Sequence, residues 1–152
     1  MTKRITLAGL CLLGTFLAGA TPVKAVQNTP LEPCGPNLAT EIKNVSGESR
    51  CFELRTYTVG EGSTIDQLHA RFREGTTALF RKHGMTIVGY WQPTTQPKTL
   101  IYVLAYADRA AREAAWDAFR SDPEWIKTRA DMPVNVQVEN VFMSATDYSP
   151  MK

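Results

Sequence analysis

The alternation of apolar and polar residues predicts four strands in the C-terminal two thirds of the chain. The segment 51–59 is rich in aromatic and β-branched residues, and 134–143 alternates apolar with polar residues. The segments 85–91 and 100–106 are apolar at odd and even positions alike, and the loop QPTTQPK separates them. These two segments therefore predict a hairpin whose strands are buried on both faces.

Two stretches between the strands carry apolar residues three or four positions apart, which predicts amphipathic helices. The first is expected to begin at Ser63 as N-cap, with Asp66 in the capping-box position, and to end before Gly84. The second follows Asp108, and a short third helix follows Asp122. The inward residues are expected to be Ile65, Leu68, Phe72, Thr76 and Leu79 in the first helix, and Ala111, Ala115, Ala118 and Phe119 in the second.

The order of these elements predicts an α+β fold, a ferredoxin-like split βαβ with a four-stranded antiparallel sheet. Two helices cover only one face of such a sheet, yet the middle strands are apolar on both. Because soluble monomers rarely expose large apolar patches, we expect a homodimer packed sheet against sheet, a dimeric α/β barrel; a different partner chain is the alternative. Glu53, Arg55 and Tyr57 share one face of the first strand, and we expect them on the helix-free side, lining an enclosed cavity.

The first residues have the layout of a secretory signal peptide. A basic start precedes an apolar run up to Ala20, and small residues follow at Val23 and Ala25. The run is shorter than the roughly 20 residues that cross a bilayer. We expect cleavage after Ala25 and export to the periplasm or the exterior, without stable membrane insertion afterwards; an uncleaved membrane anchor is the alternative. Residues 26–50 then form an N-terminal arm, and residues 51–150 form one domain.

Removal of the signal peptide changes the charge of the chain. It removes three of the 17 basic residues and no acidic residue, which leaves 14 basic residues against 15 acidic ones. The basic character of the full chain therefore belongs to the leader, and no electrostatic footprint for nucleic acid remains. Of three cysteines, only Cys34 and Cys51 remain after cleavage, and in an oxidising compartment they predict a disulfide that holds the arm to the first strand. A redox or metal pair is the alternative, but no further ligands lie at a useful spacing.

Few residues suggest catalysis. Arg55 is the strongest single candidate, either in an ion pair with Glu53 or as an anchor for an anionic group. His83 is either a helix cap or a general acid/base, and Tyr57 is the third catalytic candidate. The chain has no nucleotide-binding or metalloprotease motif and only two histidines, so we expect no cofactor and no metal. The expected ligand-binding residues are Glu53, Arg55, Tyr57, Tyr90, Trp91, Tyr102 and Tyr106.

Five stretches in order, FELRTYTV, ARFREGTTALFRKHGMTIVGYW, LIYVLAY, AWDAFRSDPEW and ATDYSP, resemble motifs of the NIPSNAP domain family over Cys51 to Pro150. The resemblance implies a dimeric α/β barrel related to antibiotic-biosynthesis monooxygenase-like barrels. Members of this family are mostly of uncertain biochemical activity. Close relatives often read R-F-R-D-H-T where this chain has RFREGT, so Gly75 stands in place of a helix histidine.

Three functions are consistent with these observations. The favoured one is an exported protein that binds a small apolar or aromatic ligand in a dimeric barrel. The second is a cofactor-independent monooxygenase or isomerase, and the third is a non-enzymatic interaction or assembly protein. An open cavity shared by Arg55 and His83 would favour the enzyme.

Overall fold

The computed structural model describes residues 32–36, 38 and 42–152. The signal peptide predicted for residues 1–25 and parts of the arm predicted for 26–50 lie outside the described residues. The elements in chain order are β1 (Cys51–Val59), α1 (Ile65–Arg71), η1 (Phe72–Thr76), α2 (Thr77–Lys82), β2 (Thr86–Trp91), β3 (Thr99–Tyr106), α3 (Arg109–Ser121), α4 (Pro123–Asp131) and β4 (Val136–Ser144).

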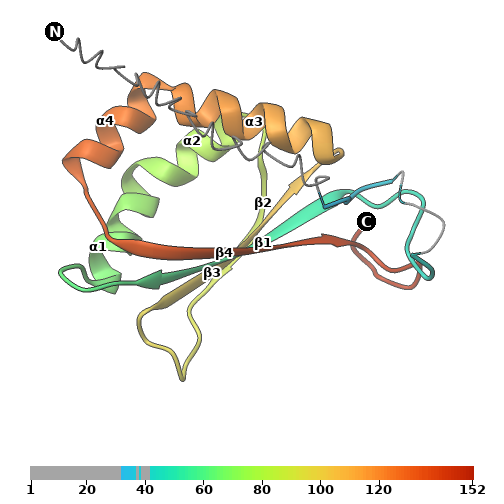
Figure 1. The fold of residues 1–152 in the computed structure, drawn as a ribbon, viewed down its shortest axis with the longest axis horizontal. Helices are drawn as coiled ribbons and strands as arrows, with labels where there is room; N and C mark the ends of the chain where they lie inside the picture. Colours follow the sequence, from blue (N-terminus) through green and yellow to red (C-terminus); the bar gives the residue numbers. More distant parts are fainter. Residues whose placement is uncertain (1–31, 37, 39–41) are drawn as a thin grey trace, which may run out of the picture. The chain divides into compact units, whose positions relative to one another are not determined.

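The four strands form one antiparallel sheet in the order β2-β3-β1-β4. The helices lie on one side of this sheet (Figure 1). The predicted ferredoxin-like α+β fold is therefore confirmed. No helix in the described part of the chain is long and apolar enough to cross a membrane.

The first predicted helix begins and ends close to the predicted residues but is not uniform. Thr64, not Ser63, is the N-cap, and it forms a capping box with Gln67. Gly84 ends the helix with φ of 74°, a conformation that glycine adopts without steric cost, as predicted. The predicted capping partner Asp66 is instead an acidic residue of the first turn.

A π-helical turn, η1, interrupts this helix. The backbone N–H of Thr77 bonds to the carbonyl of Phe72, and the Thr76 hydroxyl donates to the carbonyl of Arg71 at 3.2 Å. The wider turn keeps Arg71, Phe72 and Thr76 all buried. Such turns are rare and frequently lie at functional sites.

The buried face of α3 differs from the predicted one. Arg112, Trp116 and Phe119 are buried, whereas Ala118 is exposed. The prediction of an inward alanine face is partly wrong, because the side chains of Arg112 and Trp116 point inward and bind Glu53. Asp108 and Asp122 cap α3 and α4 through their carboxylates, as predicted.

Glu53, Arg55 and Tyr57 lie on the helix-covered face of the sheet, not on the helix-free face that we expected. Glu53 is fully buried and contacts α3, and the ring of Tyr57 packs against Phe72. The expectation was wrong because the odd-numbered residues of β1, not the even-numbered ones, face the helices. The partners supplied by α3 make it possible to bury a carboxylate beneath the helices.

The helix-free face is largely apolar. Trp91 is 51 % exposed and Val141 is 54 % exposed. Part of this face is covered, because Phe52 is buried and lines a hollow of about 380 Å³ with residues of the C-terminal segment. The apolar character of both faces, read from the sequence, is thus present in the structure.

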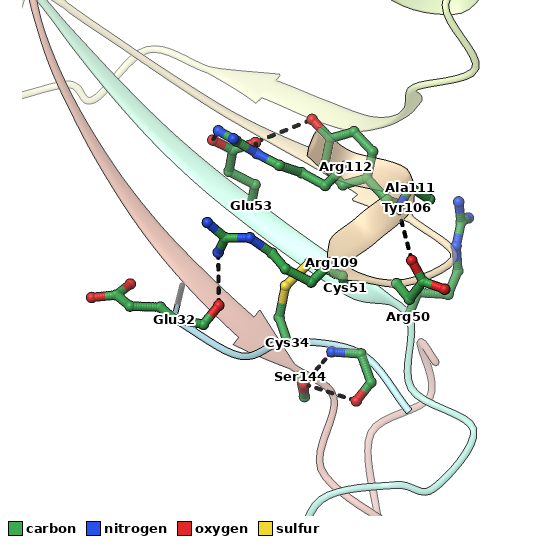
Figure 2. Close-up of a disulfide and its surroundings, with 12 residues drawn as sticks. Glu32, Cys34, Arg50, Cys51, Glu53, Tyr106, Arg109, Ala111, Arg112 and Ser144 are labelled. Carbon is green, nitrogen blue, oxygen red and sulfur yellow. Dashed lines mark hydrogen bonds and ion pairs between the residues drawn. A yellow bond between two sulfur atoms is a disulfide. The ribbon is translucent and has the colours of Figure 1, made fainter. Parts of the chain in front are cut away.

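The predicted disulfide joins Cys34 to Cys51 (Figure 2). It fixes the described part of the arm to the start of β1, and both cysteines are buried. Neighbouring hydrogen bonds hold the same segment: Arg109 donates to the carbonyl of Glu32 at 2.7 Å, and the N–H of Gly35 donates to the Ser144 hydroxyl at 2.9 Å.

Candidate functional site

A single buried carboxylate, that of Glu53, organises the space between the sheet and α3. Arg112 donates from Nη2 to Oε1 at 2.6 Å and from Nε to Oε2 at 3.0 Å. Trp116 Nε1 donates to Oε2 at 2.9 Å. The Tyr106 hydroxyl donates to the same oxygen at 3.1 Å (Figure 2). Arg55 Nη1 reaches Oε1 at 2.6 Å. Every acceptor direction of the carboxylate is therefore used by a protein donor.

The protonation states of this network follow from its contacts. Burial by itself raises the pKa of Glu53, but the hydrogen bond from Arg112 and the charges of Arg55 and Arg112 lower it to about 2. Burial raises the pKa of Tyr106 above its ordinary value, and the neighbouring carboxylate of Glu53 adds to this. Glu53 is thus a permanent anion at neutral pH and Tyr106 a permanent hydrogen-bond donor, so neither is suited to proton transfer.

Arg55 is largely enclosed. Its guanidinium stacks over Trp116 at 4.4 Å from the ring centroid, and Nη2 donates to the Tyr57 hydroxyl at 3.4 Å. Among the described residues, neither its buried Nε nor the buried Tyr102 hydroxyl has a hydrogen-bond partner. Burial raises the pKa of Tyr102 well above its ordinary value, so this phenol stays neutral. The predicted residues Glu53, Arg55, Tyr57, Tyr102 and Tyr106 therefore do form one cluster, and it is tightly filled.

His83 lies apart from this cluster. As the C-cap of α2 it places Nε2 at 2.7 Å from Oδ2 of Asp122, the residue that caps α4. Lys82 bonds to the same carboxylate at 2.9 Å. Neither His83 nor Arg55 lines any of the five best-formed cavities of the described residues. This arrangement favours the cap interpretation of His83 over catalysis.

Tyr90 and Trp91, adjacent in sequence, point to opposite faces of β2. Trp91 lies on the helix-free face over Gly89, where a Cβ would be 2.7 Å from the indole. Tyr90 points to the helices, and its hydroxyl lies 3.2 Å from Oγ1 of Thr77. The structure therefore separates these two predicted ligand-binding residues.

Tyr90 forms one wall of a recess beside η1, which we call the aromatic cavity. It measures about 380 Å³. Its aromatic wall is continuous with the core, because Phe72 packs against Tyr90 at 5.7 Å and against Tyr102 at 5.3 Å between ring centroids. The cavity is lined by His69, Phe72, Arg73, Thr77, Tyr90 and Leu100.

Sequence reasoning missed most of this lining. His69, Arg73 and Thr77 recur every four residues, one position after the apolar stripe, and this spacing could have indicated a shared helix face. His69 Nε2 lies 2.9 Å from Oε1 of Gln92 in the loop after β2. The cavity itself could not be foreseen, because it arises where the π-helical turn meets β2.

Gly75, the residue that departs from the family motif expected from the sequence, packs against α4. A Cβ there would lie 2.8 Å from Cγ2 and 3.1 Å from Oγ1 of Thr128. A side chain at this position would therefore press on α4. Within the residues that the structure describes, no group of three potential metal ligands gathers.

The β-α-β-β-α-β order of the elements and the antiparallel strand order β2-β3-β1-β4 define a ferredoxin-like α+β protein. The NIPSNAP family model matches residues 52–150, so the chain belongs to the NIPSNAP family. The family expected from the sequence motifs is confirmed.

Solved structures agree with this fold. A NIPSNAP family protein of unknown function from Agrobacterium tumefaciens is 19 % identical with a TM-score of 0.61, covering 68 % of this chain and 94 % of that one. A NIPSNAP-like domain protein from Burkholderia xenovorans is 18 % identical with a TM-score of 0.59, covering 66 % of this chain and 89 % of that one.

A more distant likeness is to SnoaB, a cofactor-independent oxygenase from Streptomyces nogalater. It is 13 % identical with a TM-score of 0.51, covering 67 % of this chain and 98 % of SnoaB. This confirms the expected relation in fold to monooxygenase-like barrels. No curated protein matches the chain.

Proposed function

We propose that the protein binds a small aromatic or otherwise apolar ligand in the aromatic cavity. The observation that carries this proposal is the recess of about 380 Å³ beside the π-helical turn. Phe72 and Leu100 are buried there, whereas Arg73 is exposed. A recess of a few hundred Å³ with an apolar wall and few polar groups is typical of small-ligand sites.

The chemistry of the lining selects the ligand. Phe72 and Tyr90 offer ring surfaces for stacking on a flat molecule. Arg73 and His69 offer donors for a carbonyl, hydroxyl or acidic substituent at the opening. Tyr57 and Tyr102 pack against Phe72 behind this wall, and Arg55 donates to the Tyr57 hydroxyl.

The test uses a fluorescent aromatic sulfonate, 1-anilinonaphthalene-8-sulfonate, on the full chain. Thr77→Phe fills the aromatic cavity and is expected to weaken probe binding about tenfold or more. Ala118→Phe adds an aromatic ring at an exposed position of α3 and is the matched control. Equal probe affinity in Thr77→Phe and the unchanged chain would overturn the proposal. Native mass spectrometry of the purified chain then identifies any ligand that it retains.

A second candidate is cofactor-independent oxygenation of an aromatic substrate in the same cavity. His69 favours it, because an imidazole at the opening can remove a proton from a methylene between aromatic rings. The resulting carbanion gives its electrons to dioxygen; one oxygen atom becomes a carbonyl and the other leaves as water. Oxygen uptake with anthrone as probe, lost in His69→Gln while probe binding persists, supports this candidate. Absence of uptake above the uncatalysed rate rejects it.

The proposed cellular setting is extracytoplasmic. The predicted signal peptide and the Cys34–Cys51 disulfide both support export, because disulfides persist mainly in oxidising compartments. Mass spectrometry of the protein recovered from an expressing bacterium is expected to show a chain that begins at Val26. An intact Met1 in the recovered protein would contradict export by cleavage.

The proposed assembly is a homodimer through the helix-free face. The exposed side chains of Trp91 and Val141 support it, since a second sheet would remove them from water. The aromatic cavity lies on the other side of the sheet, so each protomer would carry its own.

A further inference from the structure

Arg71 is a buried arginine without a counter-ion. It is 5 % exposed, and in the described part of the chain its side chain forms no ion pair and no hydrogen bond; its Nε is buried and unpartnered. Arg112, which is similarly buried, is bound to Glu53, as is the largely enclosed Arg55. Burying an unpaired guanidinium is costly, so Arg71 requires a separate explanation.

The surroundings of Arg71 are cationic and hollow. The residue lines a cleft of about 460 Å³, which we call the arginine cleft. A second arginine, Arg129 of α4, lines the same cleft and forms no ion pair among the described residues. The cleft is lined by Glu61, Gly62, Ser63, Arg71, Arg129, Pro133, Val134 and Asn135.

The like charges act on each other. Burial lowers the pKa of Arg71, and the nearby charge of Arg129 contributes in the same direction. Trp125 provides partial compensation, because the Arg71 guanidinium lies 5.8 Å from the centroid of its ring. An anion placed between the two guanidinium groups would relieve both the desolvation and the repulsion.

Neutral donors complete the setting. The Ser63 hydroxyl accepts from the N–H of Asn135 at 2.9 Å, which leaves its own proton free to donate. The Asn135 side-chain amide donates to the carbonyl of Glu61 at 3.2 Å and so fixes this turn. The Glu61 carboxylate is the one acidic group of the lining; it is exposed and forms no ion pair with either arginine.

We propose that the arginine cleft is a binding site for a small organic anion, held through a carboxylate or phosphate group by Arg71 and Arg129. Guanidinium groups bind both groups in bidentate geometry. The volume of the cleft exceeds what a lone inorganic ion needs, and Pro133 and Val134 supply an apolar wall for the rest of the molecule. The site is separate from the aromatic cavity and does not depend on the proposed function.

The first experiment is calorimetric titration of the full chain with two probes, inorganic phosphate and malonate. One anion is expected to bind per chain, with an affinity that falls as salt rises. Tighter phosphate binding assigns a phosphate ester, and tighter malonate binding assigns a carboxylic acid. No binding of either probe overturns the proposal.

Variants locate the site. Arg71→Met is expected to weaken anion binding by about tenfold to a hundredfold, the range for hydrogen bonds to charged groups. Arg81→Met, which removes an exposed arginine of α2 outside the cleft, is the matched control. Equal loss in both variants, or none in Arg71→Met, overturns the assignment. Binding of the naphthalene sulfonate in the aromatic cavity is expected to be unchanged in Arg71→Met, so the two proposals fail separately.

Melting temperatures and anion affinities of two variants test the remaining explanation, that Glu61 is the counter-ion in solution. In anion-free buffer, Arg71→Met is expected to melt at or above the temperature of the unchanged chain, because it removes an uncompensated buried charge. Glu61→Gln is expected to bind the anion more tightly. Lower melting temperatures for both variants, together with weaker anion binding in Glu61→Gln, would assign the role to Glu61 and overturn the proposal.

Discussion

Arg112 and Glu53 join the first turn of α3 to the inner strand β1 through two hydrogen bonds, of 2.6 and 3.0 Å. The carboxylate also binds Arg55, and Glu113 supplies a second carboxylate to Arg112. Removing one partner of such an ion pair lowers the stability of the fold, because the remaining charges stay buried. The predictions below begin from this pair.

Glu53→Gln is expected to lower the free energy of unfolding by about 3 kcal/mol, since it leaves the enclosed Arg55 without its carboxylate partner and Arg112 with only Glu113. Urea unfolding monitored by tryptophan fluorescence measures the loss. Glu139→Gln, on the exposed edge strand β4, is the control and should change stability by less than about 0.5 kcal/mol. Equal stability of the two variants would show that the pair contributes little.

The same carboxylate predicts an acid dependence. Its pKa is about 2 in the folded protein against 4.5 ordinarily, so between these values the unfolded chain binds more protons. Stability from Glu53 is therefore complete above pH 4.5 and is lost as pH falls towards 2, by about 3 kcal/mol in total. Unfolding of the unchanged chain and of Glu53→Gln at several pH values should give curves that converge on acidification. Parallel curves would contradict the assignment.

Gly75 and Thr128 are expected to be energetically coupled. Alanine is the better helix former by about 1 kcal/mol, but the 2.8 Å approach to the stiff, β-branched Thr128 makes Gly75→Ala destabilising, by about 1–2 kcal/mol. Adding Thr128→Ala removes the nearest atoms and should recover most of the loss. A double-mutant cycle with a coupling below about 0.5 kcal/mol would show that α4 simply moves away.

Removal of the disulfide by Cys51→Ser is expected to lower the free energy of unfolding by about 3 kcal/mol, in line with the 17-residue separation. The comparison is made under oxidising conditions by thermal and urea unfolding. Reduction of the unchanged chain should produce a similar loss. A variant as stable as the oxidised chain would mean that the hydrogen bonds of Arg109 and Gly35 suffice to hold the arm.

Val141→Asp is expected to convert the proposed homodimer into a monomer, because it places a charge in the apolar helix-free face. Light scattering coupled to size exclusion measures the mass. Ile126→Asp, at an equally exposed apolar position of α4, is the control and should stay dimeric. A monomeric unchanged chain at micromolar concentration would refute the dimer.

The sequence by itself determined the order of elements, the caps at Asp108 and Asp122, the stop at Gly84 and the Cys34–Cys51 bridge. These features depend on local periodicity, on short-range hydrogen bonds and on the small number of cysteines, all of which can be read along one chain. The apolar pattern of the middle strands likewise indicated that both sheet faces are occupied.

Only the tertiary structure decided which face of β1 the helices cover, and with it the surroundings of Glu53 and Arg55. The alternation of residues along a strand determines which residues share a face, but not which face the helices cover. A carboxylate between apolar neighbours suggests a solvent-exposed face until its partners on α3 are known. The π-helical turn, the cavity beside it and the unpaired charge of Arg71 also required three dimensions. Each arises where segments distant in sequence meet, and a linear pattern carries no record of that contact.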